Sequence, residues 1–383
     1  MQENNNDYLV FYRPDALSIW FVDLVKERLN WYYSVMRNLK PAKFLIVKRV
    51  GVEVNPYDKS LSTDELWRLH DDAVGEFIKI FGLIKRSEVE LRELNVPKYS
   101  LLDVKIELAK RMMEECSVCE RRCGARRLEG KTGVCLMADE CIVHSYFHHV
   151  GEEAPLVPSG TIFYGGCNFK CVFCQNWDIS QVKARSGLVV SPIDLAKIQA
   201  ELRRSGARNI NHVGGDPTPH LAFILESLKY LDVNVPQLWN SNMYLTVESM
   251  KLLKDVIDIW LPDFKYGSNA CAERLSKAPK YFEVVSRNHL IAYESSEMII
   301  RHLVLPNHIE CCTKPVLKWI SENTPKALVN IMDQYRPEHL VLRSPDKYPD
   351  VSRRLKYSEI SEAYRYAEEI GFKVHTHDLW LKP

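Results

Sequence analysis

The sequence predicts an α/β fold in which a parallel sheet is covered by helices. From about residue 160 onward, short apolar strands alternate with amphipathic helices. This alternation is typical of a parallel sheet with helices outside it, either barrel-like or doubly wound. The segments with strand character are 161–164, 209–213, 235–239, 257–264, 298–305 and 327–332. In either arrangement, functional groups collect at the carboxyl ends of the strands.

Length and composition narrow the class of protein. The chain has 383 residues, of which 46% are hydrophobic, enough to fill a sizeable core. Its 51 basic and 50 acidic residues give no overall charge that would attract nucleic acid or an anionic membrane. The basic residues at 121–131 are expected to form a solvated face or to pair with acidic neighbours. Because no secretory signal or membrane-spanning run is present, we expect a cytoplasmic protein without nucleic-acid or membrane partners.

Three segments are expected along the chain. Residues 1–95 contain no cysteine and show helix-like stretches at 18–39 and 63–84, which predicts a helical N-terminal module of unknown role. Residues 96–158 form a cysteine-rich linker with a possible metal site. Residues 159–383 contain all the predicted strands, and the absence of internal repeats favours a single catalytic domain there.

The distribution of cysteines points to metal binding. Of the eleven cysteines, five lie at 116–141 and three at 167–174, and the remaining three are Cys271, Cys311 and Cys312. In a reducing compartment, dense groups of this kind more often bind metal or do redox work than form disulfides. Their spacing therefore matters more than their number.

The sharpest signal is a cysteine loop that follows the first predicted strand. The strand runs into two glycines and then presents Cys167, Cys171 and Cys174 within eight residues. Thiolates select zinc or iron-sulfur clusters. Three thiols on a four-iron cluster leave one iron free to bind a small molecule, whereas a structural site closes its coordination with four protein ligands. The alternative is a zinc knuckle completed by a distant Cys or His.

Polar and glycine residues follow the later strands. Gly214 and Gly215 after the second strand permit close backbone approach, and Asp216 follows them. Further polar residues come where the next strands finish: Asn240, Asn242, Lys265 and Arg301. Each alone could equally be a loop cap or a solvated charge, but their order along the chain favours a common site.

A second group of cysteines precedes the loop. Four thiols could close a metal site completely, as a structural zinc or as an auxiliary iron-sulfur cluster. They are Cys116, Cys119, Cys123 and Cys135. One of these ligands could be replaced by Cys141, His144, His148 or His149, although the histidines are more simply interpreted as ordinary strand or loop residues.

The motifs together resemble a known family. The spacing of the cysteine loop, with Phe173 before its last cysteine, resembles the loop of the radical S-adenosylmethionine (SAM) superfamily. Gly214-Gly215-Asp216 resembles that superfamily's Gly-Gly-Glu-Pro segment, with Asp216 in place of the Glu. With the stretch at 149–155 and the cysteines at 116–135, the chain from about Cys116 onward resembles the PflX-like radical SAM proteins, which are related to pyruvate formate-lyase activating enzyme.

The resemblance implies a partial six-stranded (β/α) barrel that binds SAM and a [4Fe-4S] cluster held by Cys167, Cys171 and Cys174. It implies that the reduced cluster cleaves SAM to a 5'-deoxyadenosyl radical, with an electron donor such as ferredoxin or flavodoxin. Gly214, Gly215 and Asp216 would hold the methionine amino group. The ribose and carboxylate would be reached by Asn240, Asn242, Lys265 and Arg301. No catalytic side chain is assigned beyond the cluster.

The substrate stays open at this stage. One hypothesis is a protein substrate, as for the enzymes that activate glycyl radical proteins. A second is a small-molecule substrate, with residues 1–95 as a lid. A third is a non-catalytic binding protein stabilised by metal. A mouth covered by residues 1–95 would favour the second hypothesis over the first.

Overall fold

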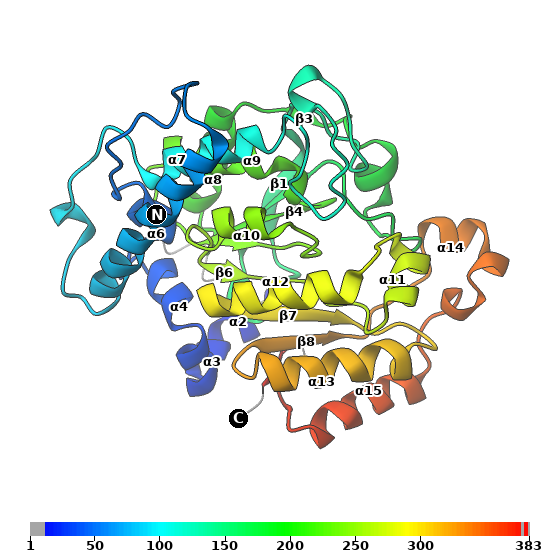
Figure 1. The fold of residues 1–383 in the computed structure, drawn as a ribbon. Coiled ribbons are helices and arrows are strands. Elements are labelled where there is room, and N and C mark those ends of the chain that lie inside the picture. The colour runs from blue at the N-terminus through cyan, green and yellow to red at the C-terminus, as the bar shows by residue number, and fades with distance from the viewer. Residues whose placement is uncertain (1–11, 377–378, 382–383) are drawn as a thin grey trace.

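The fold is built on one mixed sheet. The computed structural model describes residues 12–376 and 379–381, and in these ranges ten strands pair in the order β3-β1-β2-β4-β5-β6-β7-β8-β10-β9. The strands are β1 Ile142–His149, β2 Ser159–Tyr164, β3 Leu188–Val189, β4 Ile210–Gly214, β5 Gln237–Trp239, β6 Ile259–Trp260, β7 Glu297–Leu303, β8 Leu328–Met332, β9 Lys373–Thr376 and β10 Leu379–Leu381. Figure 1 shows them with their covering helices.

The six predicted strands form the parallel part of the sheet. Strands β2, β4, β5, β6, β7 and β8 pair in parallel in this order, which confirms the expected partial (β/α) barrel. The predicted strand at 257–264 is shorter than expected, because only Ile259–Trp260 has strand geometry. The parallel part is flanked by antiparallel strands, β1 and β3 on one side and β10 and β9 on the other.

Helices connect successive parallel strands. They are α8 Pro192–Arg204, α9 Leu221–Tyr230, α10 Val247–Leu253, α11 Asn269–Ser276, α12 Tyr281–Ser295 and α13 Lys314–Asn323, followed by α14 His339–Arg343 and α15 Tyr357–Glu369. In α8, Ser191 caps the amino end by accepting the Asp194 N–H at 3.1 Å, and Pro192 takes the first helical position. Leu195 and Leu202 of α8 are buried.

The region before the sheet is helical, as predicted. It contains α2 Asp15–Ser18, α3 Asp23–Arg28, α4 Asn30–Met36, α5 Lys43–Val47, α6 Thr63–Lys85 and α7 Leu101–Arg111. The predicted helix at 63–84 is α6, which begins with a capping box between Ser62 and Glu65. The stretch at 18–39 is divided into shorter helices. No helix in the described residues is long and apolar enough to cross a membrane.

The N-terminal helices contact the amino ends of the parallel strands. Glu297, the first residue of β7, accepts the backbone N–H groups of Trp31 at 2.6 Å and Tyr32 at 2.8 Å. Asp258, just before β6, accepts the indole N–H of Trp31 at 2.9 Å. An apolar cluster joins these helices to the sheet interior: Ile19, Val25, Leu29, Tyr32 and Met36 with Leu238, Ile259, Ile299 and Leu328. The helices thus close one end of the barrel.

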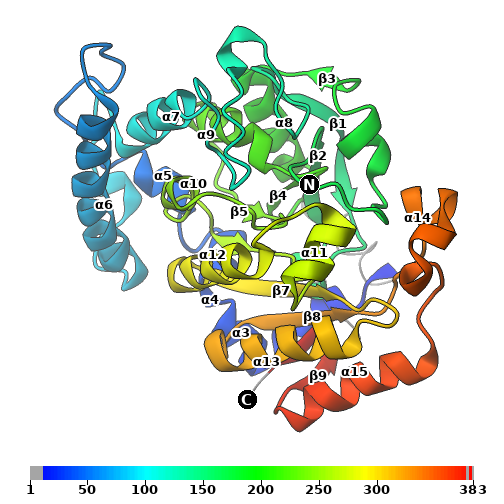
Figure 2. The ribbon, with the colours of Figure 1, turned by 45° about the vertical axis from the view of Figure 1, so that its right-hand side comes forward.

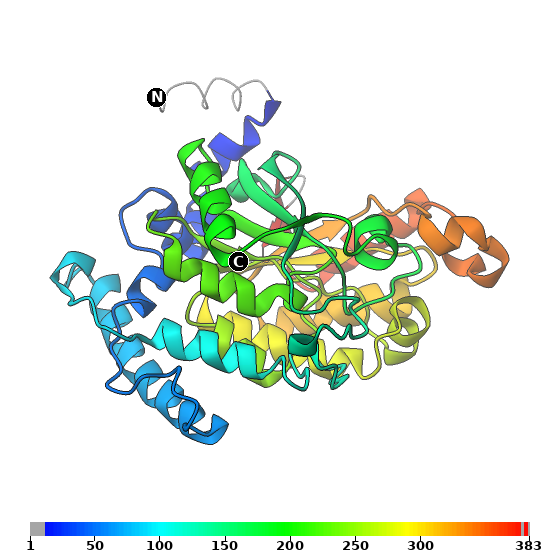
Figure 3. The same ribbon diagram turned by 90° about the horizontal axis from the view of Figure 1, so that it is seen from above.

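The position of the N-terminal helices bears on the hypothesis that residues 1–95 form a lid. Residues 19–36 make these contacts at the amino ends of the strands, whereas the cysteine loop follows the carboxyl end of β2. They therefore do not form a lid over that loop. Figures 2 and 3 show α6 and α14 at opposite flanks of the molecule.

Candidate active site

The cysteine loop lies at the carboxyl ends of the parallel strands and is held there by α11. The N–H of Lys170 donates to Ser276 O at 3.0 Å, and the N–H of Val172 donates to Leu275 O at 2.9 Å. Cys167 is buried, and Cys171 and Cys174 are partly exposed. The three thiols are close enough to influence one another electrostatically, as the spacing of the motif predicted.

Hydrogen-bonding groups surround the three sulfur atoms. Cys167 Sγ accepts the N–H of Phe169 at 3.3 Å. Cys171 Sγ accepts Ser276 Oγ at 3.0 Å, and Cys174 Sγ lies 3.4 Å from Ser180 Oγ. Donors of this kind favour the thiolate, which is the form that binds iron.

Burial opposes ionisation of the free thiols. It raises the pKa of Cys167 well above its ordinary value, and that of Cys171 to about 11. Lys265 acts in the opposite direction on Cys171. Because a metal ligand must be deprotonated, binding a cluster here would release protons.

The glycines after β4 bring the backbone against the loop. Gly214 has φ +116°, and a Cβ there would lie 2.1 Å from the Tyr164 nitrogen. A Cβ at Gly215 would lie 2.0 Å from Gly166 O. Only glycine fits at these two positions, which explains in physical terms why the Gly-Gly pair follows this strand.

Asp216 organises the neighbouring strand ends. Its carboxylate accepts the N–H of Thr218 at 2.9 Å and that of Asn242 at 3.0 Å. Burial raises its pKa to about 6, against the effect of these donors. The side chain of Asn242 in turn donates to Asn168 Oδ1 at 2.7 Å and lies 3.7 Å from Cys167 Sγ. Asp216 and Asn242, two of the predicted site residues, therefore connect the ends of β4 and β5 to the cysteine loop.

Asn240 and Lys265 differ in how far their polar groups are already satisfied. Asn240 is 5% exposed, and its Nδ2 has no hydrogen-bond partner among the described residues. A buried unpaired donor is costly and indicates a group that a ligand would satisfy. Lys265 forms an ion pair with Asp263. Burial lowers the pKa of Lys265, but Asp263 and Cys171 outweigh it and leave the pKa raised.

Arg301 lies in a polar layer across the barrel. Its Nε donates to Glu153 Oε1 at 2.7 Å, and its Nη2 pairs with Glu152. Asn211 donates to Glu152 at 3.0 Å, and Asn330 donates to Glu153 at 2.7 Å. Burial opposes the charge of Glu152, yet Arg301 and His149 lower its pKa to about 2.

The sequence did not point to Glu152 and Glu153 as partners of Arg301, although they lie in the 149–155 stretch that contributed to the family resemblance. The arginine charge is compensated by these carboxylates, so contact between Arg301 and SAM stays a prediction.

Four side chains between the Arg301 layer and the carboxyl ends of the strands are partly exposed. Phe163, Val213, Leu303 and Met332 lie near the carboxyl ends of four parallel strands and are partly exposed. Their sequence neighbours on the opposite face of the sheet are buried, as the strand period of two requires. The inner face of the sheet is thus reachable from the end that holds the cysteine loop.

The second cysteine group folds beside the first. The thiols of Cys116 and Cys123 hydrogen-bond to each other, an interaction that lowers the pKa of Cys123 to about 5. Cys119 interacts electrostatically with Cys135 and Cys123. A Cβ at Gly166 would lie 2.4 Å from Cys135 O, which places this group against the cysteine loop.

The other candidate ligands of the second group point elsewhere. His144 Nε2 lies 3.3 Å from Ala184 O, and His148 Nε2 lies 2.9 Å from Ser205 Oγ. Cys141 is buried, and burial alone raises its pKa. In the basic stretch, Arg122 pairs with Glu120 and Glu248, as expected. Arg127 differs from the expectation, because it is 1% exposed and donates to Ala138 O at 2.8 Å and Pro219 O at 2.7 Å. Buried carbonyls, and not solvent, satisfy this guanidinium.

The residues at the strand ends fit a [4Fe-4S] cluster and SAM. Three thiols with hydrogen bonds to each sulfur suit a cluster with one open iron. The unpaired Nδ2 of Asn240 and the glycine backbone of β4 suit a polar ligand beside it. A cavity of about 450 Å³, lined by Trp31, Lys43 and Glu297 among others, lies at the amino ends of the strands and is not this site.

The chain belongs to the radical SAM superfamily. The superfamily's model matches residues 161–320, from β2 into α13. Membership implies a [4Fe-4S] cluster and SAM as cofactors. The chain is 47% identical over 347 residues to the uncharacterized protein MJ0674 of Methanocaldococcus jannaschii, covering 89% of this chain and 97% of that protein.

Solved structures are similar to the chain at low sequence identity. TYW1 with a lysine-pyruvate adduct bound is 14% identical, with a TM-score of 0.38, over 58% of this chain and 79% of that chain. SuiB of Streptococcus suis bound to S-adenosylmethionine is 12% identical, with a TM-score of 0.38, over 84% of this chain and 67% of that chain.

Proposed function

We propose that this chain is a radical SAM enzyme that abstracts hydrogen from a protein substrate, in the manner of the enzymes that activate glycyl radical proteins. Cys167, Cys171 and Cys174 hold the cluster. The observation that carries the proposal is the position of these three thiols: they lie at the carboxyl ends of parallel strands, with a hydrogen-bonding group at each sulfur.

The chain's own residues have separable roles in this proposal. When bound, the reduced cluster and SAM supply a 5'-deoxyadenosyl radical. The backbone at Gly214 and Gly215 lies directly against the cysteine loop and holds the methionine end of SAM there. The free amide of Asn240 donates to SAM, and Asp216 and Asn242 keep the loop in place.

Lys265 and Arg301 complete the proposed SAM pocket. Lys265 is close enough to Cys171 to stabilise its thiolate, and its partner Asp263 keeps it charged. Arg301 acts through its pair with Glu152 and Glu153, which fixes the polar layer beneath the pocket. Buried ion pairs with several hydrogen bonds hold their geometry well, although they add little stability.

The accessible inner face supports a protein substrate over a small molecule. Phe163, Val213, Leu303 and Met332 are partly exposed at the end that holds the cysteine loop. The helices at residues 19–36 contact the other end of the barrel and do not cover this side. An extended segment of a partner protein can therefore approach the proposed site.

The chain is divided into three parts in this proposal. Residues 159–383 form the catalytic domain, residues 96–158 a cysteine-rich segment with a second metal site, and residues 1–95 the helical module. An electron donor of the ferredoxin or flavodoxin type and a cytoplasmic location remain predictions. Within the superfamily, we propose that the chain is one of the PflX-like proteins, because of the motifs in which it resembles them.

The test is formation of 5'-deoxyadenosine by the full chain. Protein reconstituted anaerobically with iron and sulfide, then reduced with dithionite, should release 5'-deoxyadenosine from SAM. Cys171→Ala should lose this activity, whereas Cys141→Ala, which removes a buried thiol apart from the loop, should keep it. Equal product from wild type and Cys171→Ala would show that the cysteine loop is not the cluster site.

The substrate class needs a separate measurement. A deuterium-labelled cell extract of the source organism is separated by size into a protein fraction and a small-molecule fraction. We expect deuterium to be transferred into 5'-deoxyadenosine from the protein fraction. Transfer from the small-molecule fraction alone would favour the small-molecule hypothesis.

A further inference from the structure

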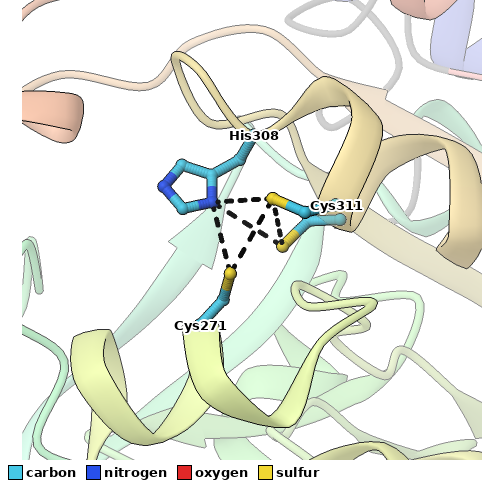
Figure 4. A group of neighbouring side chains, drawn as sticks. Cys271, His308 and Cys311 are labelled. Carbon is cyan, nitrogen blue, oxygen red and sulfur yellow. Dashed lines mark hydrogen bonds between the residues drawn. The ribbon is translucent and has the colours of Figure 1, made fainter.

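Three cysteines and a histidine that carry no role in the proposed chemistry meet outside the cysteine loop. Cys271 lies in α11, His308 lies in the loop after β7, and Cys311 and Cys312 lie in the turn before α13. One ligand atom from each of the four lies within 4.8 Å of the others. Figure 4 shows the sulfur atoms of Cys271 and Cys311 facing the imidazole of His308.

The distances match the corners of a tetrahedron. Nδ1 of His308 lies 3.3 Å from Cys311 Sγ, 3.6 Å from Cys271 Sγ and 3.8 Å from Cys312 Sγ. Cys311 Sγ lies 3.8 Å from both other sulfurs. A tetrahedral zinc with Zn–S about 2.3 Å and Zn–N about 2.0 Å has sulfur–sulfur edges of about 3.8 Å and nitrogen–sulfur edges of about 3.5 Å. The four atoms therefore already surround a space of the size of one ion.

We propose that Cys271, His308, Cys311 and Cys312 bind a structural Zn²⁺. Three thiolates and one imidazole form a Cys₃His set, which selects zinc. Four protein ligands close the coordination, so the site is structural and not catalytic. A four-iron cluster would not fit, because its irons and sulfides lie between the thiolates and hold them further apart than these sulfurs are.

The histidine is oriented by a carboxylate, as zinc-bound histidines usually are. Nε2 of His308 lies 2.8 Å from Asp350 Oδ2, so the ring presents Nδ1 to the three thiols. Asp350 also pairs with Arg274 of α11. A carboxylate behind the imidazole fixes the tautomer and raises the basicity of the ligand nitrogen. His308 is 4% exposed, so this orientation is enclosed by the fold.

The zinc would join segments that support the cysteine loop. Helix α11 carries Cys271 and ends at Ser276, whose hydroxyl donates to Cys171 Sγ and whose carbonyl accepts the N–H of Lys170. Fixing α11 to the turn at 309–313 would hold that end of the loop in place. Only this consequence rests on the proposed function, since the ligand geometry is independent of it.

Metal content of the full-length protein tests the site. Zinc and iron per chain should be measured by mass spectrometry for wild type, Cys271→Ser/Cys311→Ser and the matched double variant Cys116→Ser/Cys119→Ser. We expect Cys271→Ser/Cys311→Ser to lose one zinc per chain with unchanged iron, and the matched variant to keep that zinc. Zinc unchanged in Cys271→Ser/Cys311→Ser, or iron lost from it while the zinc is kept, would overturn the proposal.

Cobalt binding tests the site with all four proposed ligands in place. The result therefore does not depend on whether Cys271→Ser/Cys311→Ser folds. Co²⁺ added to the metal-free Cys116→Ser/Cys119→Ser/Cys171→Ala protein should give the intense thiolate-to-cobalt absorption and visible bands of a tetrahedral site. His308→Cys should retain the metal with a stronger thiolate band, because a fourth sulfur replaces nitrogen. A featureless or octahedral Co²⁺ spectrum from the folded protein would contradict a Cys₃His site.

Discussion

Glu297 shows how a single carboxyl group fixes the N-terminal helices to the sheet. Its carboxylate accepts two backbone N–H groups at the start of α4, and burial raises its pKa to about 7 in spite of them. Lys43 is also enclosed, and burial lowers its pKa to about 8, against nearby Asp258. The contacts between the N-terminal helices and the sheet thus include groups whose charge depends on pH near neutrality.

The raised pKa of Glu297 predicts a pH dependence. Between the ordinary value of 4.5 and about 7, the folded protein keeps this proton while the unfolded chain has released it. The free energy of unfolding therefore falls as pH rises through this window, by up to about 1.4 kcal/mol for each pH unit crossed. Glu297→Gln should show a smaller fall between pH 5 and pH 7.5 in urea unfolding.

The control for this prediction is Glu294→Gln, a change at an exposed carboxyl on the neighbouring helix. It should follow the wild-type profile. Parallel profiles for wild type and Glu297→Gln would mean that Glu297 is ionised in the folded protein throughout this range.

At the scale of elements, the candidate site depends on how closely three chain segments approach one another. The cysteine loop is in backbone contact with α11, and the end of β4 lies so close to β2 and to the loop that no Cβ fits at Gly214 or Gly215. The second cysteine group contacts the loop at Gly166, through the backbone of Cys135. The loop is therefore positioned by its neighbours and not by its own sequence alone.

Gly214→Ala should disrupt this packing. The residue has φ +116° and its new Cβ would lie 2.1 Å from the Tyr164 nitrogen, so β2 and β4 would have to separate. We expect a loss of stability of more than about 1 kcal/mol and less iron bound after reconstitution. Thermal unfolding and iron analysis measure the two effects.

Gly75→Ala is the matched control, because nothing lies within 4 Å of a Cβ built there in α6. Replacing a glycine inside a helix by alanine should stabilise the protein by about 0.5–1 kcal/mol. A Gly214→Ala protein as stable as wild type, with full iron content, would contradict the close approach of β4 to β2.

At the scale of the whole molecule, the barrel has two different ends. The carboxyl ends of its strands carry the cysteine loop and an accessible inner face, and the amino ends are filled by the N-terminal helices. Between them lies the layer formed by Arg301, Glu152 and Glu153. The helical module thus supplies part of the core and is not an independent appendage.

A fragment of residues 96–383 should therefore be unstable. Removing the N-terminal helices exposes Leu238, Ile259, Ile299 and Leu328, each now fully buried. We expect the fragment to bind a hydrophobic dye and to unfold at a lower temperature than the full chain. An equal melting temperature for the fragment and the full chain would show that residues 1–95 are a separate domain.

The sequence by itself determined the elements whose signal is local. Alternation of apolar strands and amphipathic helices predicted six parallel strands, and the spacing of Cys167, Cys171 and Cys174 predicted the superfamily. The Gly-Gly pair at the end of β4 was also recognised, because the need for glycine there arises from the backbone itself. These features depend on residues a few positions apart, so the period of the secondary structure and the spacing of the cysteines are enough to predict them.

Only the tertiary structure decided which distant residues meet. Cys271 comes together with His308, and Arg301 with Glu152, across long separations that no periodicity encodes. The N-terminal helices fill the amino end of the barrel and do not form a lid, because their apolar faces complete a core left open by the strands. Such contacts follow from how the whole chain packs, and packing is a property of the folded molecule and not of any segment.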